Sequence, residues 1–349
     1  MQSDIRIVPG NYWRDILHQP EALADTLTAL EESRTLTGLA RRLNTGSFRR
    51  VVLTGMGSSY HGLHPLYLRL VGHGLTPVMV ETSELIHYQR RLFDSRTLVI
   101  AVSQSGRSAE IVSMLKVNRR RSPVIAVTNT PDSPLGRHAD ATVLTRAGEE
   151  FSVSCKTYVA ALIALQWVAD ILCEKTLRRT RRELASAAPL ASKYLAGWKK
   201  HVASMAERLR DIRTLYLVGR GSSLAAVGTG GLIIIESDHF PAEGMSSAAF
   251  RHGPLEIVNA ETFVLVFSGD AQAREMHRKL MKDVRKRNGK GQLAGDDGTL
   301  PALRFAAAPD SIRPVLEILP VEMVTLALAA LSGREAGRFE SATKVTTTE

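Results

Sequence analysis

The chain of 349 residues is long enough for two domains of ordinary size, and its composition, 44% hydrophobic and 23% charged, is typical of a globular protein. The N-terminus has no apolar signal core, and no uninterrupted apolar run approaches the roughly 18 residues that a membrane span needs, so we expect no membrane contact. The two cysteines, Cys155 and Cys173, form no metal or disulfide pattern, which favours a cytoplasmic location and no bound metal.

The formal net charge of +10 raises the question of a nucleic-acid partner. The basic residues stand in short runs, at Arg119–Arg121, Arg178–Arg182 and Arg285–Arg287. Few aromatic residues interleave with them, and no helix-turn-helix or zinc pattern accompanies them. We therefore predict a solvated basic face and no nucleic-acid partner. The same charge would favour an anionic small substrate.

Residues 1–45 are predicted to form a helical lead-in, with one helix around Tyr12–Leu17 and a second from Pro20 to about Arg42. Residues 46–190 then read as a first α/β domain. It opens with a strand, Arg50–Thr54, that runs into Gly55-Met56-Gly57-Ser58-Ser59 and a leucine-rich helix. Glycine lets the backbone approach a ligand closely, but the spacing is not that of a dinucleotide fingerprint, so no nicotinamide site is expected.

A second strand, turn and helix begins at Leu98–Val102, whose apolar, β-branched residues indicate a buried parallel strand. Ser103-Gln104-Ser105-Gly106 follows, and Ser108 precedes apolar residues at helical spacing. A helix N-terminus suits an anion, and the serines add hydroxyl donors. The pattern predicts a phosphate cradle without the lysine of a P-loop. A serine-capped helix of any α/β protein would look the same.

Further strands are predicted at 78–80, 124–127 and 141–144, which gives an open, mostly parallel sheet. Ligands in such sheets bind at the carboxyl ends of the strands, where both serine-rich turns fall. A long apolar helix, Val159–Cys173, leads to the predicted domain boundary.

The pattern repeats in residues 191–335, which we take as a second domain. A strand at Leu215–Val218 runs into Gly219-Arg220-Gly221-Ser222-Ser223, 164 residues after the first glycine turn (219 − 55). A later strand, Thr262–Phe267, ends in Ser268-Gly269-Asp270, a version of the first serine turn that lacks two serines. The first copy is therefore the better phosphate site, and residues 336–349 remain as a C-terminal tail.

Four segments in order, MGSSYHG, SQSGRSAE, RHGPLEIV and ATKVTTTE, resemble the sugar isomerase (SIS) domain family. The resemblance covers nearly the whole chain and is closest to the tandem isomerase half of glucosamine-6-phosphate synthase and to related amino-sugar phosphate deaminases and deglycases. It implies an α/β fold of two tandem SIS-type three-layer αβα domains with mostly parallel sheets, followed by an active-site tail.

The resemblance also implies roles for single residues. A sugar phosphate would be held by Ser58, Ser59, Ser103, Gln104, Ser105 and Ser108. Glu236 would move a proton between C1 and C2, His252 would open the ring, and Lys344 would meet the carbonyl of the open sugar. The spacing of 16 residues from Glu236 to His252 matches the family (252 − 236). A homodimer with a shared active site is implied as well.

These residue types suit the chemistry by themselves. A partly desolvated carboxylate can shuttle a proton beside a carbonyl, histidine titrates near neutrality, and a lysine amine can form a Schiff base, so no cofactor is required. Structural roles are the alternatives: a salt bridge for Glu236, backbone capping for His252, and a solvated tail residue for Lys344.

Three departures from the synthase pattern leave the sugar and the direction of reaction open. Ile233 replaces a lysine, Arg107 stands where an acidic residue is frequent, and the segment Gly148–Lys156 is one residue shorter. The chain also carries no glutaminase domain, so we do not expect it to release ammonia from glutamine. The resulting hypothesis is an amino-sugar phosphate isomerase/deaminase, with a fructosamine 6-phosphate deglycase or a non-catalytic sugar-phosphate-binding module as alternatives.

Overall fold

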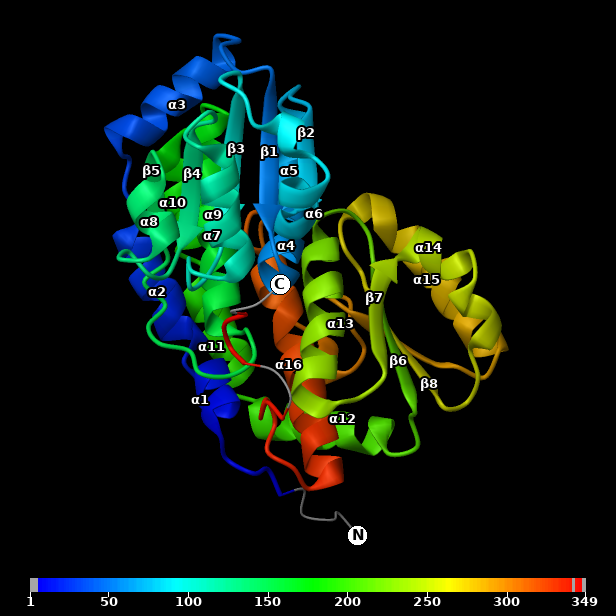
Figure 1. Ribbon diagram of the computed structural model, residues 1–349. Coiled ribbons are helices and arrows are strands. Elements are labelled where there is room, and N and C mark those ends of the chain that lie inside the picture. The colour runs from blue at the N-terminus through cyan, green and yellow to red at the C-terminus, as the bar shows by residue number, and fades with distance from the viewer. Residues whose placement is uncertain (1–5, 341–342, 347–349) are drawn as a thin grey trace. The chain divides into compact units, whose positions relative to one another are not determined.

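The computed structural model describes residues 6–340 and 343–346, which group into two compact units assembled from separate stretches of chain (Figure 1). The first-sheet unit consists of Glu21–Glu149, Lys156–Ser186 and Ala342–Glu349. The second-sheet unit consists of Met1–Pro20, Glu150–Cys155 and Ala187–Ser341. The contiguous boundaries inferred from the sequence (1–45, 46–190, 191–335 and 336–349) stay a prediction.

The first-sheet unit is built on five parallel strands in the order β2-β1-β3-β4-β5. Their bounds are β1 Arg50–Gly55, β2 Pro77–Glu81, β3 Thr97–Val102, β4 Val124–Thr128 and β5 Ala141–Leu144. All six residues of β3 are buried, as its unbroken apolar run predicts. The parallel sheet expected from the sequence is therefore confirmed.

Helices cover both faces of this sheet. The helices of this unit are α2 Gln19–Ala29, α3 Arg34–Asn44, α4 Gly57–His61, α5 His64–Gly72, α6 Thr82–His87, α7 Ala109–Asn118, α8 Pro134–His138, α9 Lys156–Leu172 and α10 Leu177–Leu184, with the 3-10 turn η1 Arg90–Leu92. Helices α6, α7 and α8 pack on one face through a core that includes Val52, Val99 and Met114. Helix α9, buried along nearly its whole length, packs with α3, α5 and α10 on the other face. The result is the three-layer arrangement expected from the resemblance.

The single helix predicted from Pro20 to Arg42 is wrong in one respect, because the chain breaks between α2 and α3. Ser33 ends the break as the N-cap of α3, and its Oγ accepts a hydrogen bond from the Leu36 amide at 3.1 Å. A serine that caps a helix offers the backbone an alternative to continuing the previous one.

The second-sheet unit repeats the same strand order with four parallel strands, β7-β6-β8-β9. Their bounds are β6 Thr214–Gly219, β7 Ala242–Ser246, β8 Thr262–Phe267 and β9 Lys290–Ala294. Strand β6 takes the place of β1 and β8 the place of β3, so the internal repeat read from the sequence is confirmed. A counterpart of β5 is missing from the described part of this sheet.

The helices of this unit also form two layers. They are α1 Asn11–Leu17, α11 Ala187–Leu195, α12 Trp198–Leu209, α13 Leu224–Asp238, α14 Ser247–Arg251, α15 Ala271–Lys286 and α16 Arg313–Ser332, with the 3-10 turns η2 Gly221–Ser223, η3 Pro254–Ile257 and η4 Pro301–Leu303. Helices α14 and α15 pack on one face, through a core that includes Phe250, Val264 and Leu280. Helices α11, α12 and α13 surround α16 on the other side.

Helix α16 has the length and apolar composition of a membrane span, although the sequence shows no uninterrupted apolar run of that length. It is 83% buried inside the fold over its most apolar window, as the core helix of a globular unit would be. Two buried carboxylates, Glu317 and Glu322, interrupt its apolar surface.

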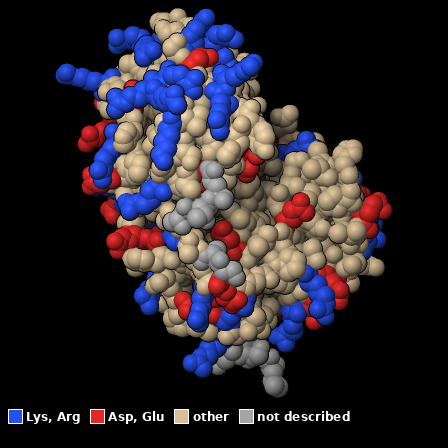
Figure 2. Space-filling model, viewed as in Figure 1, with Lys and Arg blue, Asp and Glu red and all other residues tan. Residues whose placement is uncertain are grey.

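The basic residues gather unevenly over the chain. The first-sheet unit holds 23 basic and 15 acidic residues, a net charge of +8 out of the total of +10. Figure 2 shows Lys and Arg side chains gathered at the top of the view, over this unit. Arg49-Arg50 stand at the start of β1, and Arg119–Arg121 precede β4, so both runs lie at the amino edge of the first sheet, where Arg119–Arg121 are exposed.

Candidate active site

The two serine-rich turns of the first-sheet unit meet at the carboxyl edge of its sheet. Strands β1 and β3 are neighbours, and Thr54 pairs with Ala101 one residue before each strand ends. A Cβ atom on Gly55 would lie 3.1 Å from the Val102 carbonyl oxygen and 3.0 Å from the carbonyl carbon of Ser59. A side chain at Gly55 would crowd both neighbours, so glycine favours the close approach of the Ser58-Ser59 turn to the end of β3.

The turn Ser103–Gly106 is held in shape by its own first serine. The buried Ser103 Oγ accepts a hydrogen bond from the Gly106 amide at 3.1 Å, and the Ser103 amide donates to the Val127 carbonyl at 3.1 Å. Gly106 has a φ of +61°, and a Cβ atom there would lie 2.1 Å from Ser133 Oγ. Only glycine fits this left-handed, crowded position.

A third polar segment, at the end of β4, supports the serine turn and was missed from the sequence. The Gln104 carbonyl accepts hydrogen bonds from the Asn129 amide at 3.1 Å and from the Thr128 hydroxyl at 3.2 Å. Asn129 also bonds the Gly148 carbonyl through its side-chain amide at 2.8 Å. The signal was available, because Thr128-Asn129-Thr130 are polar residues directly after a buried strand.

The predicted phosphate ligands lie around the start of α7. Ser105 and Ser108 are half-buried, and so are Ser58 and Ser59 in α4. Ser108 stands at the N-cap of α7, yet its side chain forms no capping hydrogen bond, so its hydroxyl is not committed to its own helix. The N-terminal end of α7 adds a partial positive charge, and Arg107 is exposed beside it. This edge can bind an anion.

The C-terminal tail reaches the same turn. The Ala109 amide, in the first turn of α7, donates a hydrogen bond to the Thr346 carbonyl at 3.1 Å. Lys344 lies two residues before Thr346 and is half-buried. Two residues span at most about 7 Å, so the backbone of Lys344 lies near the serine turn. The structure therefore places the backbone of Lys344 near the start of α7, where Ser108 lies.

Glu236 and His252 belong to the second-sheet unit. Glu236 lies in the last turn of α13 and is half-buried, after the apolar run Leu232–Ile235. His252 is exposed at the C-cap of α14, where its amide donates to the Ala249 carbonyl at 3.0 Å. Their roles and those of the serines and Lys344 stay predictions.

Two histidines, His61 and His64, follow the Ser58-Ser59 turn, and no role was predicted for them from the sequence. Burial lowers the pKa of His61, and burial together with the neighbouring His61 lowers the pKa of His64 to about 4. Both imidazoles are therefore neutral near pH 7. They therefore add no positive charge beside the turn.

The chain is similar to a known family and to several known proteins. Residues 47–170 match the family described as SIS domain. Over 352 residues, the chain is 29% identical to the glutamine–fructose-6-phosphate aminotransferase (isomerizing) of Pyrobaculum aerophilum. That match covers 96% of this chain and 57% of the relative, so the chain spans little more than half the length of that protein.

Two solved structures share the fold over almost the whole chain. The C-terminal domain of glucosamine-fructose-6-phosphate aminotransferase from Francisella tularensis has a TM-score of 0.83 at 21% identity, and the match covers 98% of this chain and 99% of that one. Glucosamine-6-phosphate deaminase from Thermotoga maritima has a TM-score of 0.78 at 16% identity, with 97% and 100% covered. Residues 47–170 thus match the SIS domain family, and the chain as a whole is similar in fold to the C-terminal domain of a glucosamine-fructose-6-phosphate aminotransferase.

Proposed function

We propose that the chain is a phosphosugar isomerase/deaminase that converts a hexosamine 6-phosphate to a ketose 6-phosphate and ammonia. The observation that carries the proposal is the position of the tail. The tail segment that carries Lys344 bonds the first turn of α7, whose N-cap is the half-buried Ser108. A site that only bound phosphate would need the hydroxyls and the helix terminus but no lysine-bearing segment on that helix.

The phosphate would be held by Ser58, Ser59, Ser105 and Ser108 at the N-terminus of α7. Ser103 and Gln104 would act mainly through the backbone of the turn, since the Ser103 hydroxyl accepts from Gly106 and the Gln104 carbonyl accepts from the end of β4. Phosphate binding far from the reacting carbons provides binding energy that positions C1 and C2.

The reaction would use three side chains. His252 would pass a proton to the ring oxygen as the anomeric hydroxyl loses one, which opens the ring to a C1 aldehyde. Glu236 would take the proton from C2 as the C1 oxygen gains one, so that an enolamine forms across C1 and C2. It would then return the proton to C1 as the C2 amine loses one, which leaves a C2 imine. Lys344 would displace ammonia from C2 as a Schiff base, which water hydrolyses to the ketose 6-phosphate.

Two further proposals follow from the same roles. The exposure of His252 supports a homodimer in which the histidine serves a site shared with a second copy. The reaction needs only acid–base and amine chemistry, for which the chain's own side chains suffice, and we propose that it takes place in the cytoplasm.

The test is to measure ammonia and ketose phosphate from a panel of hexosamine and fructosamine 6-phosphates. We expect ammonia and fructose 6-phosphate from glucosamine 6-phosphate. The Glu236→Gln variant should lose turnover while binding of the substrate stays near that of the native chain. Glu243→Gln, an exposed carboxylate in β7, is the matched control and should keep full activity.

Other outcomes would replace the proposal. Release of an amino acid from a fructosamine 6-phosphate would identify a deglycase. Tight binding of the panel without any product would identify a sugar-phosphate-binding module. Unchanged turnover in Glu236→Gln would remove Glu236 from the mechanism.

A further inference from the structure

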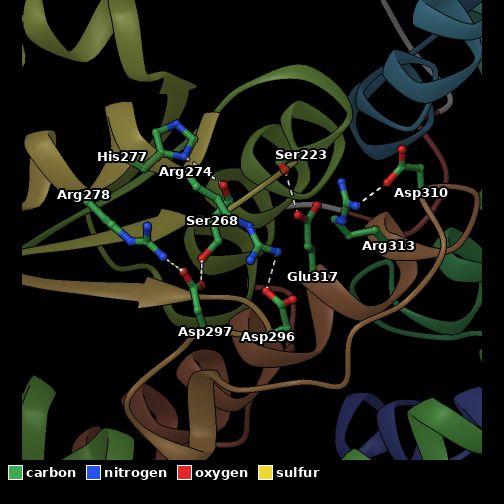
Figure 3. A network of polar contacts seen from close by, with 10 residues as sticks. All are labelled: Ser223, Ser268, Arg274, His277, Arg278, Asp296, Asp297, Asp310, Arg313 and Glu317. Carbon is green, nitrogen blue, oxygen red and sulfur yellow. Dashed lines mark hydrogen bonds and ion pairs between the residues drawn. The ribbon is translucent and has the colours of Figure 1, made fainter. Parts of the chain in front are cut away.

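A polar cavity lies at the carboxyl edge of the second sheet, among the residues drawn in Figure 3, and the proposed function makes no use of it. Its volume is about 40 Å³. Its polar walls include Ser268, Arg274, Asp296, Arg313 and Glu317, and the segment Ala306–Ala308 forms an apolar side. A single water needs about 10–15 Å³, so the cavity has room for about three groups of that size.

The cavity is not a second phosphate site. At the place equivalent to the first serine turn, Asp270 caps α15, and its Oδ1 accepts a hydrogen bond from the Ala273 amide at 3.0 Å. A carboxylate therefore already occupies the helix N-terminus that an anion would use. The second repeat also lacks two of the serines of the first, which removes hydroxyl donors that a phosphate would need.

Most polar groups around the cavity are paired with each other. Arg274 Nη2 bonds Asp296 Oδ1 at 2.7 Å, and Arg278 Nη2 bonds Asp297 Oδ2 at 3.2 Å. The Ser223 hydroxyl donates to Glu317 Oε1 at 2.7 Å, and the Ser268 hydroxyl donates to Asp297. Figure 3 shows the residues that make these contacts, which belong to η2, the turn after β8, α15, the loop after β9 and α16.

Two side-chain atoms of residues that line the cavity are buried and have no hydrogen-bond partner among the residues that the structure describes. They are Glu317 Oε2 and Arg274 Nε. The Glu317 side chain is completely buried, and its Oε2 is left open although its Oε1 is bonded. A buried polar atom without a partner destabilises the fold by about 1–3 kcal/mol, so these positions favour an occupant that supplies the missing bonds.

The two unpartnered atoms and the charges of the lining residues determine the chemistry of that occupant. Arg274 Nε can only donate a hydrogen bond, while a carboxylate oxygen accepts one. A hydroxyl does both tasks. Arg274 and Arg313 disfavour a cation, and Asp296 and Glu317 disfavour an anion. The walls are therefore suited to a neutral group that carries hydroxyls.

We propose that this cavity binds adjacent hydroxyl groups of a small uncharged polyol, as a second sugar-binding site distinct from the predicted phosphosugar site. One hydroxyl accepts from Arg274 Nε and donates to Glu317 Oε2, and the carbon chain lies against Ala306–Ala308. Burial raises the pKa of Glu317 to about 7, and a hydroxyl can bond the carboxyl group in either protonation state.

The test uses the full chain and sorbitol, a polyol with neither a phosphate nor a carbonyl group. Saturation-transfer NMR should show sorbitol binding to the native chain. Glu317→Leu and Arg274→Lys should each weaken it at least about tenfold, because each removes one of the two open atoms. Arg274→Lys keeps a cation opposite Asp296, so it tests the site even if the leucine variant fails to fold.

Two controls locate the binding. Glu322→Gln alters the other completely buried carboxylate of α16, whose Oε2 accepts from Gln19 Nε2 at 2.6 Å, and should leave sorbitol affinity unchanged. Ser105→Ala alters the predicted phosphosugar site and should also leave it unchanged. The proposal is overturned if sorbitol does not bind, if water alone fills the cavity at high sorbitol concentration, if inorganic phosphate displaces sorbitol, or if Glu317→Leu and Arg274→Lys bind it normally.

Discussion

The Ala109 amide donates a hydrogen bond to the Thr346 carbonyl, which joins two residues 237 positions apart in the sequence (346 − 109). The bond uses one of the amide groups at the start of α7 that would otherwise lack a partner within the helix. It places a tail residue directly on the turn that is predicted to bind phosphate. The position of the tail and the conformation of the turn are therefore linked in this structure.

Lys344 should matter for turnover more than for binding. Lys344→Ala is expected to lower kcat at least about 100-fold, because the amine that meets the sugar carbonyl is gone, while KM changes little. Steady-state kinetics on the best substrate of the panel would measure both constants. Lys116→Ala, an exposed lysine of α7, is the control and should behave like the native chain. A rise in KM with kcat unchanged would assign Lys344 to binding alone.

The backbone of the serine turn should tolerate no side chain at Gly106. Gly106→Ala places a Cβ atom at a φ of +61° and 2.1 Å from Ser133 Oγ, so we expect a loss of at least about 2 kcal/mol in the free energy of unfolding, together with weaker phosphate binding. Urea denaturation would measure it. Gly72→Ala is the matched control, since a Cβ atom at Gly72 meets nothing within 4 Å. Equal stability of the two variants would contradict the geometry.

Two N-cap serines should respond in opposite ways to the same substitution. Ser33 caps α3 through its hydroxyl, so Ser33→Ala should lower the free energy of unfolding by about 1 kcal/mol and leave activity unchanged. Ser108 makes no such bond, so Ser108→Ala should change stability little and raise KM for the phosphosugar. Thermal unfolding and kinetics on both variants provide the comparison. A stability loss without a KM effect in Ser108→Ala would indicate that Ser108 is only structural.

Glu317 should make the fold less stable as the pH rises. Burial raises its pKa from 4.5 to about 7, so in this interval the folded chain holds a proton that the unfolded chain has released. Its contribution is fully present below pH 4.5 and is lost as the pH rises through 7, by about 3 kcal/mol in all. Unfolding by urea at several pH values should show a shallower decline in Glu317→Gln than in the native chain. Parallel curves for the two proteins would refute the assignment.

The sequence predicted the strands with unbroken apolar runs closely but missed two others. Strand β3 was expected at Leu98–Val102 and extends over Thr97–Val102, and β8 matches its expected bounds. Strands β7 and β9 were not foreseen, because Ala242–Ser246 and Lys290–Ala294 are partly exposed and lack a continuous apolar run. Their pairing with β6 and β8 is decided by the neighbouring strand and not by their own residues.

The candidate site likewise has residues that the sequence could identify and contacts that it could not. The serines of the first turn could be named from the sequence, because a buried strand, a hydroxyl-rich turn and a helix start follow one another directly in the chain. The polar segment around Asn129 could also have been noticed, but its bond to the Gln104 carbonyl could not be predicted, since that depends on which strand lies beside β3. The unpartnered Oε2 of Glu317 could not be predicted either. The sequence shows an acidic residue in an apolar helix but not which groups surround its side chain.

By itself, the sequence determined the two α/β repeats, the edge of the first sheet at which the serine turn lies, and the residue types available for acid–base chemistry. These are local properties, set by hydrophobic periodicity and by the chemistry of neighbouring residues. Only the tertiary structure decided that Thr346 bonds Ala109 and that Glu317 and Arg274 line one cavity. Such contacts join residues distant in sequence, and they form because packing the helices on each sheet fixes where every buried polar group must find a partner.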